Sequence, residues 1–448
     1  MTKGFWAISD QGLFATSNFA LNVLLARWIS PYDYGAFSVA FAIFTLVGVI
    51  HTATLTEPML VFGPGKYKDR FSEYLGTVIH GHLGFAALGG LLLLLTSLGL
   101  ALFGLNSLSV TLVALAFAEP FILLLWLMRR ACYARLEPHL AASGGALYMV
   151  LMLAGAYVLY RGEWLSASSA FGVMGFSSLV VSVWLIIRLR VKRSPLRRSE
   201  LARDSLDSHW RYGRWSVANE GLNWVPMNIY FVLLPIFGGL EAGASFKALM
   251  NLIMPMLQAI WALAILLLPV LVRARDEGDT SGGRTRFGTR VRLALVPFAL
   301  GPILYWLVLG LFHQQLVDWL YGGQYTEHAA LLWLLGLSPI VAAVKQVMGQ
   351  SLKALQRPDQ LFWAFAFSAV LTLTLGTGFV YLWGVVGAGI GFLGSQAVTA
   401  VLALFFYRRL RSSQHQTASA RRQPRWSVPG RRYPATTELP REESNELA

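Results

Sequence analysis

Charged side chains and cysteine are scarce in this sequence. Only 13% of the 448 residues are charged, whereas soluble domains carry about 25%. The single cysteine, Cys132, excludes an intramolecular disulfide and has no CxxC or Cys/His partner for a metal or redox motif. Because 55% of the residues are hydrophobic, the composition excludes an ordinary soluble domain and predicts a protein whose solvent is lipid.

The sequence also lacks the motifs of a cofactor-dependent or metal-dependent enzyme. It has no P-loop lysine motif, which argues against ATP hydrolysis. Gly389, Gly391 and Gly394 have the spacing of a dinucleotide-binding loop, but they lie inside an apolar run with no strand before it. His80 and His82 are about 200° apart around a helix, so they cannot hold one metal ion from one face. We therefore predict no cofactor, no metal site and no enzymatic activity.

Apolar runs long enough to cross a bilayer are abundant, since about 20 apolar residues span the hydrocarbon core. They predict an all-α integral membrane protein with about twelve transmembrane helices. The expected spans are residues 5–29, 34–57, 73–103, 107–129, 139–160, 166–188, 213–237, 241–272, 291–312, 328–352, 359–383 and 385–407.

Basic residues alternate between the predicted loops, as the positive-inside rule requires. The loops expected to face the cytoplasm contain Lys66, Lys68 and Arg70, then Arg129, Arg130 and Arg135, then the basic residues of 188–214 and 273–292, then Lys353 and Arg357. The loops on the other side contain only Arg27 and Arg161. This asymmetry places both termini in the cytoplasm. It also explains the formal charge of +14 by contact with membrane lipid headgroups, so we expect no nucleic-acid binding.

The predicted spans fall into two sets of six. Asp10-Gln11-Gly12-Leu13 and Asn219-Glu220-Gly221-Leu222 start the two halves alike, and Gly35-Ala36 and Gly243-Ala244 repeat at nearly the same offset. Six spans per half would relate the two six-helix bundles by a pseudo-two-fold axis along the membrane normal, with a substrate site between them. The predicted regions are an N-terminal bundle (1–190), a basic cytoplasmic linker (191–211), a C-terminal bundle (212–411) and a disordered cytoplasmic tail (412–448).

Several segments resemble a known family. Residues 9–41, SDQGLFATSNFALNVLLARWISPYDYGAFSVAF, resemble the opening hairpin of the Wzx-type bacterial polysaccharide flippases of the multidrug/oligosaccharidyl-lipid/polysaccharide exporter superfamily. Residues 316–340, LVDWLYGGQYTEHAALLWLLGLSPI, look like that family's outer loop entering its tenth span. Residues 355–358 and 384–391 look like the starts of spans eleven and twelve.

The resemblance implies a V-shaped two-bundle fold in the cell inner membrane. It also implies movement of an undecaprenyl-pyrophosphate-linked oligosaccharide across that membrane by alternating access, with a glycan polymerase or glycosyltransferases as candidate partners. Two alternatives stay open: a cation-coupled drug or small-molecule exporter of the same superfamily, and a non-transporting membrane component of a glycan-synthesis complex. A membrane enzyme fits less well, because the longest predicted outer loop, 313–327, is short.

Charges inside predicted spans are the candidate functional residues, since each costs roughly 2.5–3.5 kcal/mol at mid-membrane. Lys345, Lys247 and Arg27 are candidates for a cationic cavity that binds a pyrophosphate or an acidic sugar. The alternatives are snorkelling to the interface for Lys247 and Arg27, and a structural pair for Lys345.

Acidic residues in the spans are candidates for ion coupling or for a gate. Glu119 lies near the middle of the fourth span and is the best single candidate for proton or cation coupling. Asp10 and Glu220, at corresponding positions of the two halves, would face one inner gate. The alternatives are a buried structural hydrogen bond for Glu119 and interfacial or capping positions for the other two.

Overall fold

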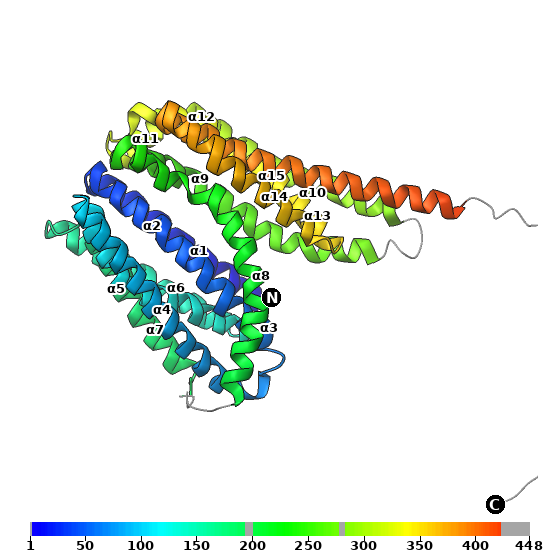
Figure 1. The fold of residues 1–448 in the computed structure, drawn as a ribbon, viewed down its shortest axis with the longest axis horizontal. Helices are drawn as coiled ribbons and strands as arrows, with labels where there is room; N and C mark the ends of the chain where they lie inside the picture. Colours follow the sequence, from blue (N-terminus) through cyan, green and yellow to red (C-terminus); the bar gives the residue numbers. More distant parts are fainter. Residues whose placement is uncertain (1, 193–199, 277–282, 423–448) are drawn as a thin grey trace, which may run out of the picture. The chain divides into compact units, whose positions relative to one another are not determined.

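The chain is helical throughout the part that the computed structural model describes, residues 2–192, 200–276 and 283–422 (Figure 1). Nine of the described helical stretches are long and apolar enough to cross a membrane. Two of these, Glu200–Arg275 and Pro358–Leu410, each contain two of the predicted spans, and α1 (Thr2–Trp28) adds one more. The prediction of an all-α fold with twelve spans is confirmed.

The first half of the chain forms one set of packed helices. Within it, α5 (Asn106–Ala134) packs against α7 (Ala167–Arg188), α4 (Phe71–Leu102) and α2 (Pro31–His51). The first helix, α1, packs against α6 (Pro138–Arg161). Local sequence starts two of these helices: Ser30 accepts a hydrogen bond from the backbone of Asp33, and Ser166 forms a capping box with Ser169. The remaining elements of this half are the short helix α3 (Glu57–Phe62), a π-helical turn η1 (Thr52–Thr56) and a 3₁₀ turn η2 (Lys68–Arg70).

The second half forms the other set. It contains α8 (Glu200–Asn228), α9 (Tyr230–Asp276), α10 (Gly283–Leu311), α11 (His313–Tyr321), η4 (Thr326–Leu331), α12 (Leu332–Leu335), α13 (Ser338–Ala354), α14 (Pro358–Leu371), η5 (Thr372–Gly376) and α15 (Thr377–Arg422). Two of these helices are broken, at Gly239 (φ 80°) in α9 and at Gly384 (φ 53°) in α15. Positive φ is easy only for glycine, so these glycines separate spans seven and eight and spans eleven and twelve where the apolar runs predicted it. Residues up to Phe406 form one compact unit, to which the packing described here belongs.

The end of the predicted linker is helical, because α8 begins at Glu200. Leu201, Ser205 and His209 recur every four residues and are buried, which gives this part of α8 one face to pack. His209 Nε2 lies 2.7 Å from the Tyr74 hydroxyl of α4. The start of α8 is thus attached to the first set of helices, and α8 also packs against α14 of the second set.

A surface ion pair supports the same attachment. Lys66 Nζ lies 2.6 Å from Asp204 of α8 and also donates to Ser208. The hydrogen bond with Asp204 raises the pKa of Lys66. Both side chains are nearly half exposed, so this pair positions α8 more than it stabilises the fold.

The two sets of helices meet closely at the end expected to face outward. A Cβ added at Gly35 of α2 would overlap the backbone carbonyl of Leu240 in α9, so only glycine allows this approach. Next to it, the Asn251 side chain donates to the Tyr34 hydroxyl at 2.8 Å. Arg27 of α1 donates to the backbone carbonyl of Trp319 at 3.0 Å. These contacts close the outer end between the two sets.

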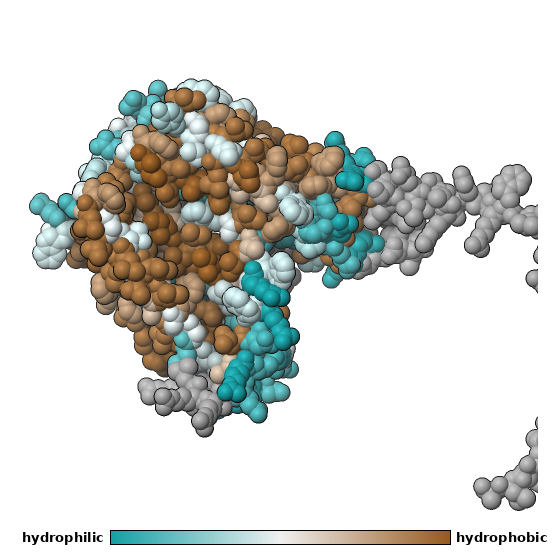
Figure 2. Space-filling model, viewed as in Figure 1, coloured by the Kyte–Doolittle hydropathy of each residue, from teal (hydrophilic) through white to brown (hydrophobic). Residues whose placement is uncertain are grey.

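The exterior has the surface expected of a membrane protein. Figure 2 shows hydrophobic residues over most of the visible face, with hydrophilic residues gathered along α8 and near the ends of the helices. The apolar part of α4 is mostly exposed, with only 17% of its most apolar window buried. Such a surface is stable only against lipid.

We predict that Gly35→Ala lowers the unfolding midpoint of the detergent-solubilised protein in a thermal melt. The added methyl group meets backbone, which cannot rotate away, and overpacking typically costs about 1–3 kcal/mol. Gly12→Ala is the matched control, because nothing lies within 4 Å of a Cβ at Gly12, and alanine in a helix is favoured over glycine by about 0.5–1 kcal/mol. Equal midpoints for the two variants would show that α2 and α9 do not approach closely.

Candidate functional site

The second set of helices encloses a pocket of about 320 Å³. It reaches the surface beside Lys353, an exposed residue at the end of α13 that is expected to face the cytoplasm. With the outer end closed, the pocket is accessible from this opposite end. Its walls come from α8, α9, α13 and α14, and the lining residues are Asn219, Glu220, Asn223, Met227, Trp261, Lys345, Gln346, Gly349, Gln350, Lys353, Leu361 and Phe365.

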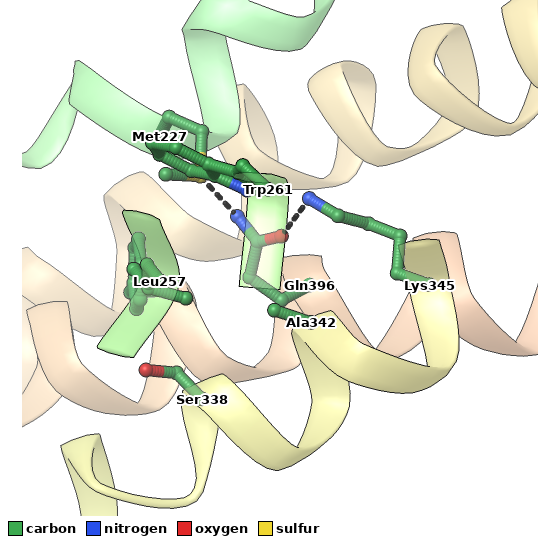
Figure 3. Close-up of a pocket in the computed structure, with 8 residues that line it drawn as sticks. Met227, Leu257, Trp261, Ser338, Ala342, Lys345 and Gln396 are labelled. Carbon is green, nitrogen blue, oxygen red and sulfur yellow. Dashed lines mark hydrogen bonds between the residues drawn. The ribbon is translucent and has the colours of Figure 1, made fainter. Parts of the chain in front are cut away.

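Lys345 is the buried charge of this pocket. Its side chain comes from α13, is only 7% exposed, and donates a hydrogen bond of 2.5 Å to the Gln396 carbonyl oxygen (Figure 3). The amide of Gln396 is oriented by a contact from its nitrogen to the sulfur of Met227. Within the described ranges no carboxylate lies at ion-pair distance from Lys345. A lysine has three donors, so its charge and two of its donors stay available to an anion.

The other two cationic candidates lie outside the pocket. Lys247 of α9 is 7% exposed and sits over the rings of Phe41 and Phe231, with its nitrogen 4.4 and 5.1 Å from their centroids. It is held between α2 and α9 by cation–π contacts. Arg27 belongs to the closed outer end through its bond to Trp319. The structure therefore brings Lys345 alone of the three to the pocket, and the substrate roles of all three stay predictions.

The two acidic gate candidates have different surroundings. Glu220 lines the pocket and accepts a hydrogen bond of 3.1 Å from Asn219. Asp10 is fully buried in the first set, where Arg129 donates to both its oxygens at 3.1 and 2.8 Å and the Tyr133 hydroxyl donates at 2.6 Å. A paired carboxylate of this kind holds α1 to α5. The gate roles of Asp10 and Glu220 stay predictions.

Glu119 is fully buried. The residue is 0% exposed, and neither carboxyl oxygen has a hydrogen-bond partner in the part of the chain that the structure describes. Its Oε1 faces α4, where a Cβ at Gly89 would lie 3.4 Å away. An ionised carboxylate in such a place costs several kcal/mol, so Glu119 is neutral in this conformation. Its role in ion coupling stays a prediction.

Several pocket residues were not singled out from the sequence. Gln346, Gln350 and Lys353 project from α13 beside Lys345, and Asn219 and Asn223 project from α8. A signal for them exists in the sequence. Lys345 and Lys353 are eight residues apart and Gln346 and Gln350 are four apart, which places these polar side chains on one face of a helix whose sequence is otherwise mostly apolar.

Comparison with solved structures identifies the fold, although no protein-family model and no curated protein matches the sequence. An inward-facing multidrug resistance MATE family transporter of the MOP superfamily matches with a TM-score of 0.75 at 16% identity, over 92% of this chain and 99% of that chain. An outward-facing multidrug resistance MATE family transporter matches with a TM-score of 0.63 at 16% identity, over 92% of this chain and 96% of that chain. A MOP superfamily transporter from Pyrococcus furiosus matches with a TM-score of 0.64 at 15% identity, over 91% of this chain and 94% of that chain. At these identities the likeness shows the fold: a two-lobed, twelve-helix, multi-pass membrane architecture of the MATE type.

The buried Asp10–Arg129 pair gives a stability prediction. Arg129→Ala should lower the unfolding free energy by about 3–5 kcal/mol, because it leaves a buried carboxylate without its partner. Lys66→Ala, which removes the half-exposed pair with Asp204, should cost no more than about 1 kcal/mol. Denaturant unfolding followed by circular dichroism in detergent measures both. Similar losses for the two variants would show that Asp10 is hydrated rather than buried.

Proposed function

We propose that the chain moves a lipid-linked oligosaccharide, carried on a polyprenyl pyrophosphate, across the inner membrane by alternating access. The observation that carries this proposal is the lining of the pocket. It combines a buried lysine that bonds a neutral amide, a second lysine at the mouth, four amide side chains and a tryptophan. Each part matches one part of such a lipid: the amides and Trp261 match the sugars, and the lysines match the pyrophosphate.

The amide side chains suit a carbohydrate. Asn219, Asn223, Gln346 and Gln350 each present both donors and acceptors, as the hydroxyl groups of a sugar do. Trp261 offers an apolar ring face against which the C–H face of a sugar can pack, with an N–H at its edge for a polar group. A flat, apolar drug molecule would leave these amides without partners, at a cost for each buried group.

The lysines suit an anionic carrier. Lys353 and Lys345 lie eight residues apart on one face of α13, which places them about 12 Å apart along the helix axis. An anion entering from the cytoplasmic end would pass Lys353 and reach Lys345. There the anion would replace the neutral Gln396 amide as the hydrogen-bond partner of Lys345. The new hydrogen bond would be charge-assisted.

The two sets of helices are in close contact at the outer end, and alternating access would require this contact to open. The close contacts of Gly35, Tyr34 and Arg27 would have to separate for the outer end to open. Lys247, now covered by Phe41 and Phe231, lies in this contact and would become accessible. A pyrophosphate could then move from Lys345 toward Lys247 as the outer end opens.

A cation-coupled drug exporter of the same superfamily is the rival function. The multidrug transporters among the fold neighbours support it. Against it, the pocket holds two lysines and one acid, Glu220, so its charge favours anions. A fold neighbour from Pyrococcus furiosus is described as having a binding pocket of reverse polarity that suggests a different function. This fold therefore accommodates pockets of different charge.

A vesicle assay tests the proposed function. Purified protein is reconstituted into neutral lipid vesicles with a polyprenyl-pyrophosphate disaccharide that carries a fluorophore on its sugar, and transbilayer movement is followed by quenching from outside. The wild-type protein should accelerate movement. Lys345→Ala should reduce the initial rate by about tenfold or more, since a charge-assisted hydrogen bond is worth about 1.5–3 kcal/mol.

Lys66→Ala is the matched control, because it removes a lysine that lies outside the pocket, and it should keep the wild-type rate. Equal rates for Lys345→Ala and wild type would contradict the role of Lys345. Movement of a lipophilic cationic dye without movement of the lipid-linked sugar would establish the exporter. Vesicles that move neither probe would point to a non-transporting component of a glycan-synthesis complex.

A further inference from the structure

A group of buried titratable side chains lies in the first set of helices, outside the pocket. His51 Nε2 of α2 lies 3.0 Å from His82 Nδ1 of α4, and the two residues are 0% and 1% exposed. Glu119 of α5 points toward the same helix α4. Three titratable groups from three helices therefore lie along one face of α4, and neither the closed outer end nor the pocket accounts for them.

The hydrogen bond within the histidine pair has one donor and one acceptor. In a pair of neutral rings, one of the two facing nitrogens carries a proton and the other accepts it in the hydrogen bond. In the tautomer in which His51 Nε2 is the donor, His82 Nδ1 is the acceptor. His51 Nδ1, which has no partner among the described residues, is then a free acceptor.

A proton added at this free nitrogen would be stabilised by the pair. His51 would become an imidazolium, and its bond to His82 would become charge-assisted while keeping its direction. Glu119, in contrast, is neutral in this conformation because both its oxygens lack partners. The group therefore holds one acid that can release a proton and one base that can accept one.

The position of His51 connects this group to the pocket. The π-helical turn η1 begins at the next residue, Thr52, and such turns are frequent at functional sites. The Thr54 carbonyl of η1 accepts a hydrogen bond of 3.0 Å from His209 of α8. A Cβ at Gly213, one turn further along α8, would lie 3.1 Å from the Ala53 carbonyl. α8 thus rests on η1, and its next two turns supply Asn219, Glu220 and Asn223 to the pocket.

We propose that Glu119 and the His51–His82 pair form a proton-binding site whose occupancy is linked to opening and closing of the outer end, with α8 carrying the linkage from η1 to the pocket. This inference rests on the proposed transport function, for which it supplies the coupling ion. The present conformation is the one in which Glu119 carries a proton. Loss of that proton leaves an unpaired carboxylate that is stable only where water reaches it, so deprotonation favours another conformation.

The neighbouring helices carry further titratable groups. On α7, residues 167–187 include none, and on α4 there is none after His82. Asp10, Arg129 and Tyr133 form their own cluster between α1 and α5. Further groups on these helices are His209 and Tyr74, which bond each other, Glu57 of α3, which bonds Ser216, Glu73 of α4, which pairs with Arg70, Tyr34 and Asp33 at the outer end of α2, His80 on the other face of α4, Arg130 and Cys132 near the end of α5, and His139 and Tyr148 on α6.

The test measures the outer end as a function of pH in vesicles without cargo. Spin labels are attached through Trp164→Cys, between α6 and α7, and Trp319→Cys, in α11, two exposed positions at the outer end of the two sets, in a Cys132→Ser background. Pulsed electron–electron resonance reports the distance between them from about pH 5.5 to 8.5, the range over which a buried carboxyl or an imidazole can titrate. We expect short distances at low pH and a growing population of long distances as the pH rises.

Substitutions separate the site from a general pH effect. Glu119→Gln should keep the short distance at every pH, and His82→Gln should move the midpoint by about 0.5 pH unit or more, since it replaces the titratable partner of His51 with a neutral amide. The matched controls are His80→Gln, which lies two residues away on another face, and Glu73→Gln, an acid at the exposed end of α4. Both should behave as wild type.

A second measurement distinguishes loss of the Glu119 proton from a general loosening of the fold. Infrared difference spectra should show a protonated-carboxyl band in the wild type that disappears in Glu119→Gln. A wild-type distance that does not change with pH, or wild-type titration in both Glu119→Gln and His82→Gln, would overturn the proposal. Because no cargo is present, such a failure would leave the flippase proposal standing, and an inactive vesicle assay would leave the proton linkage standing.

Discussion

The close approach of α2 and α9 at Gly35 is the contact on which the rest of the structure depends. It brings the backbone of one set of helices against the backbone of the other, which is possible only because Gly35 has no side chain. The hydrogen bond between Asn251 and Tyr34 lies in the same contact. At this end Lys247 is covered by Phe41 and Phe231, and the pocket beside Lys345 reaches the surface at the other end, beside Lys353.

Two buried groups lack the partners that their chemistry demands. Lys345 has a neutral amide as its hydrogen-bond partner, and the carboxyl oxygens of Glu119 have none among the described residues. Groups of this kind cost stability and are retained where they serve a function. They lie in different sets of helices, and α8 contacts both sets, through Thr54 at one end and the pocket at the other. In our proposal, α8 transmits protonation in one set of helices to the ligand site in the other.

The architecture could be predicted from the sequence because it depends on hydropathy and on loop charge. The breaks at Gly239 and Gly384 fall where the apolar runs were divided. The helical start of α8 was missed, since most of its residues from Glu200 are polar and its buried face contacts helices that are distant in the sequence. A helix of this kind is recognisable by periodicity but not by a search for apolar runs.

The site could be predicted only in part. Lys345 was found because a charge inside an apolar run is conspicuous. Lys247 looked alike in the sequence, yet its surroundings depend on Phe41 of another helix, which no local pattern reveals. The histidine pair was missed for the same reason: His80 and His82 were considered together, whereas the partner of His82 is His51, 31 residues away.

The central claim is that a cytoplasmic pocket beside Lys345 binds an anionic, sugar-bearing lipid while the outer end is closed. It is tested most directly by the rate at which a membrane-impermeant maleimide labels Gln350→Cys in the Cys132→Ser background. We predict fast labelling from the cytoplasmic face, slowed by a polyprenyl-pyrophosphate disaccharide and unaffected by uncharged polyprenol. Faster labelling from the outer face, or equal effects of the two lipids, would contradict the account.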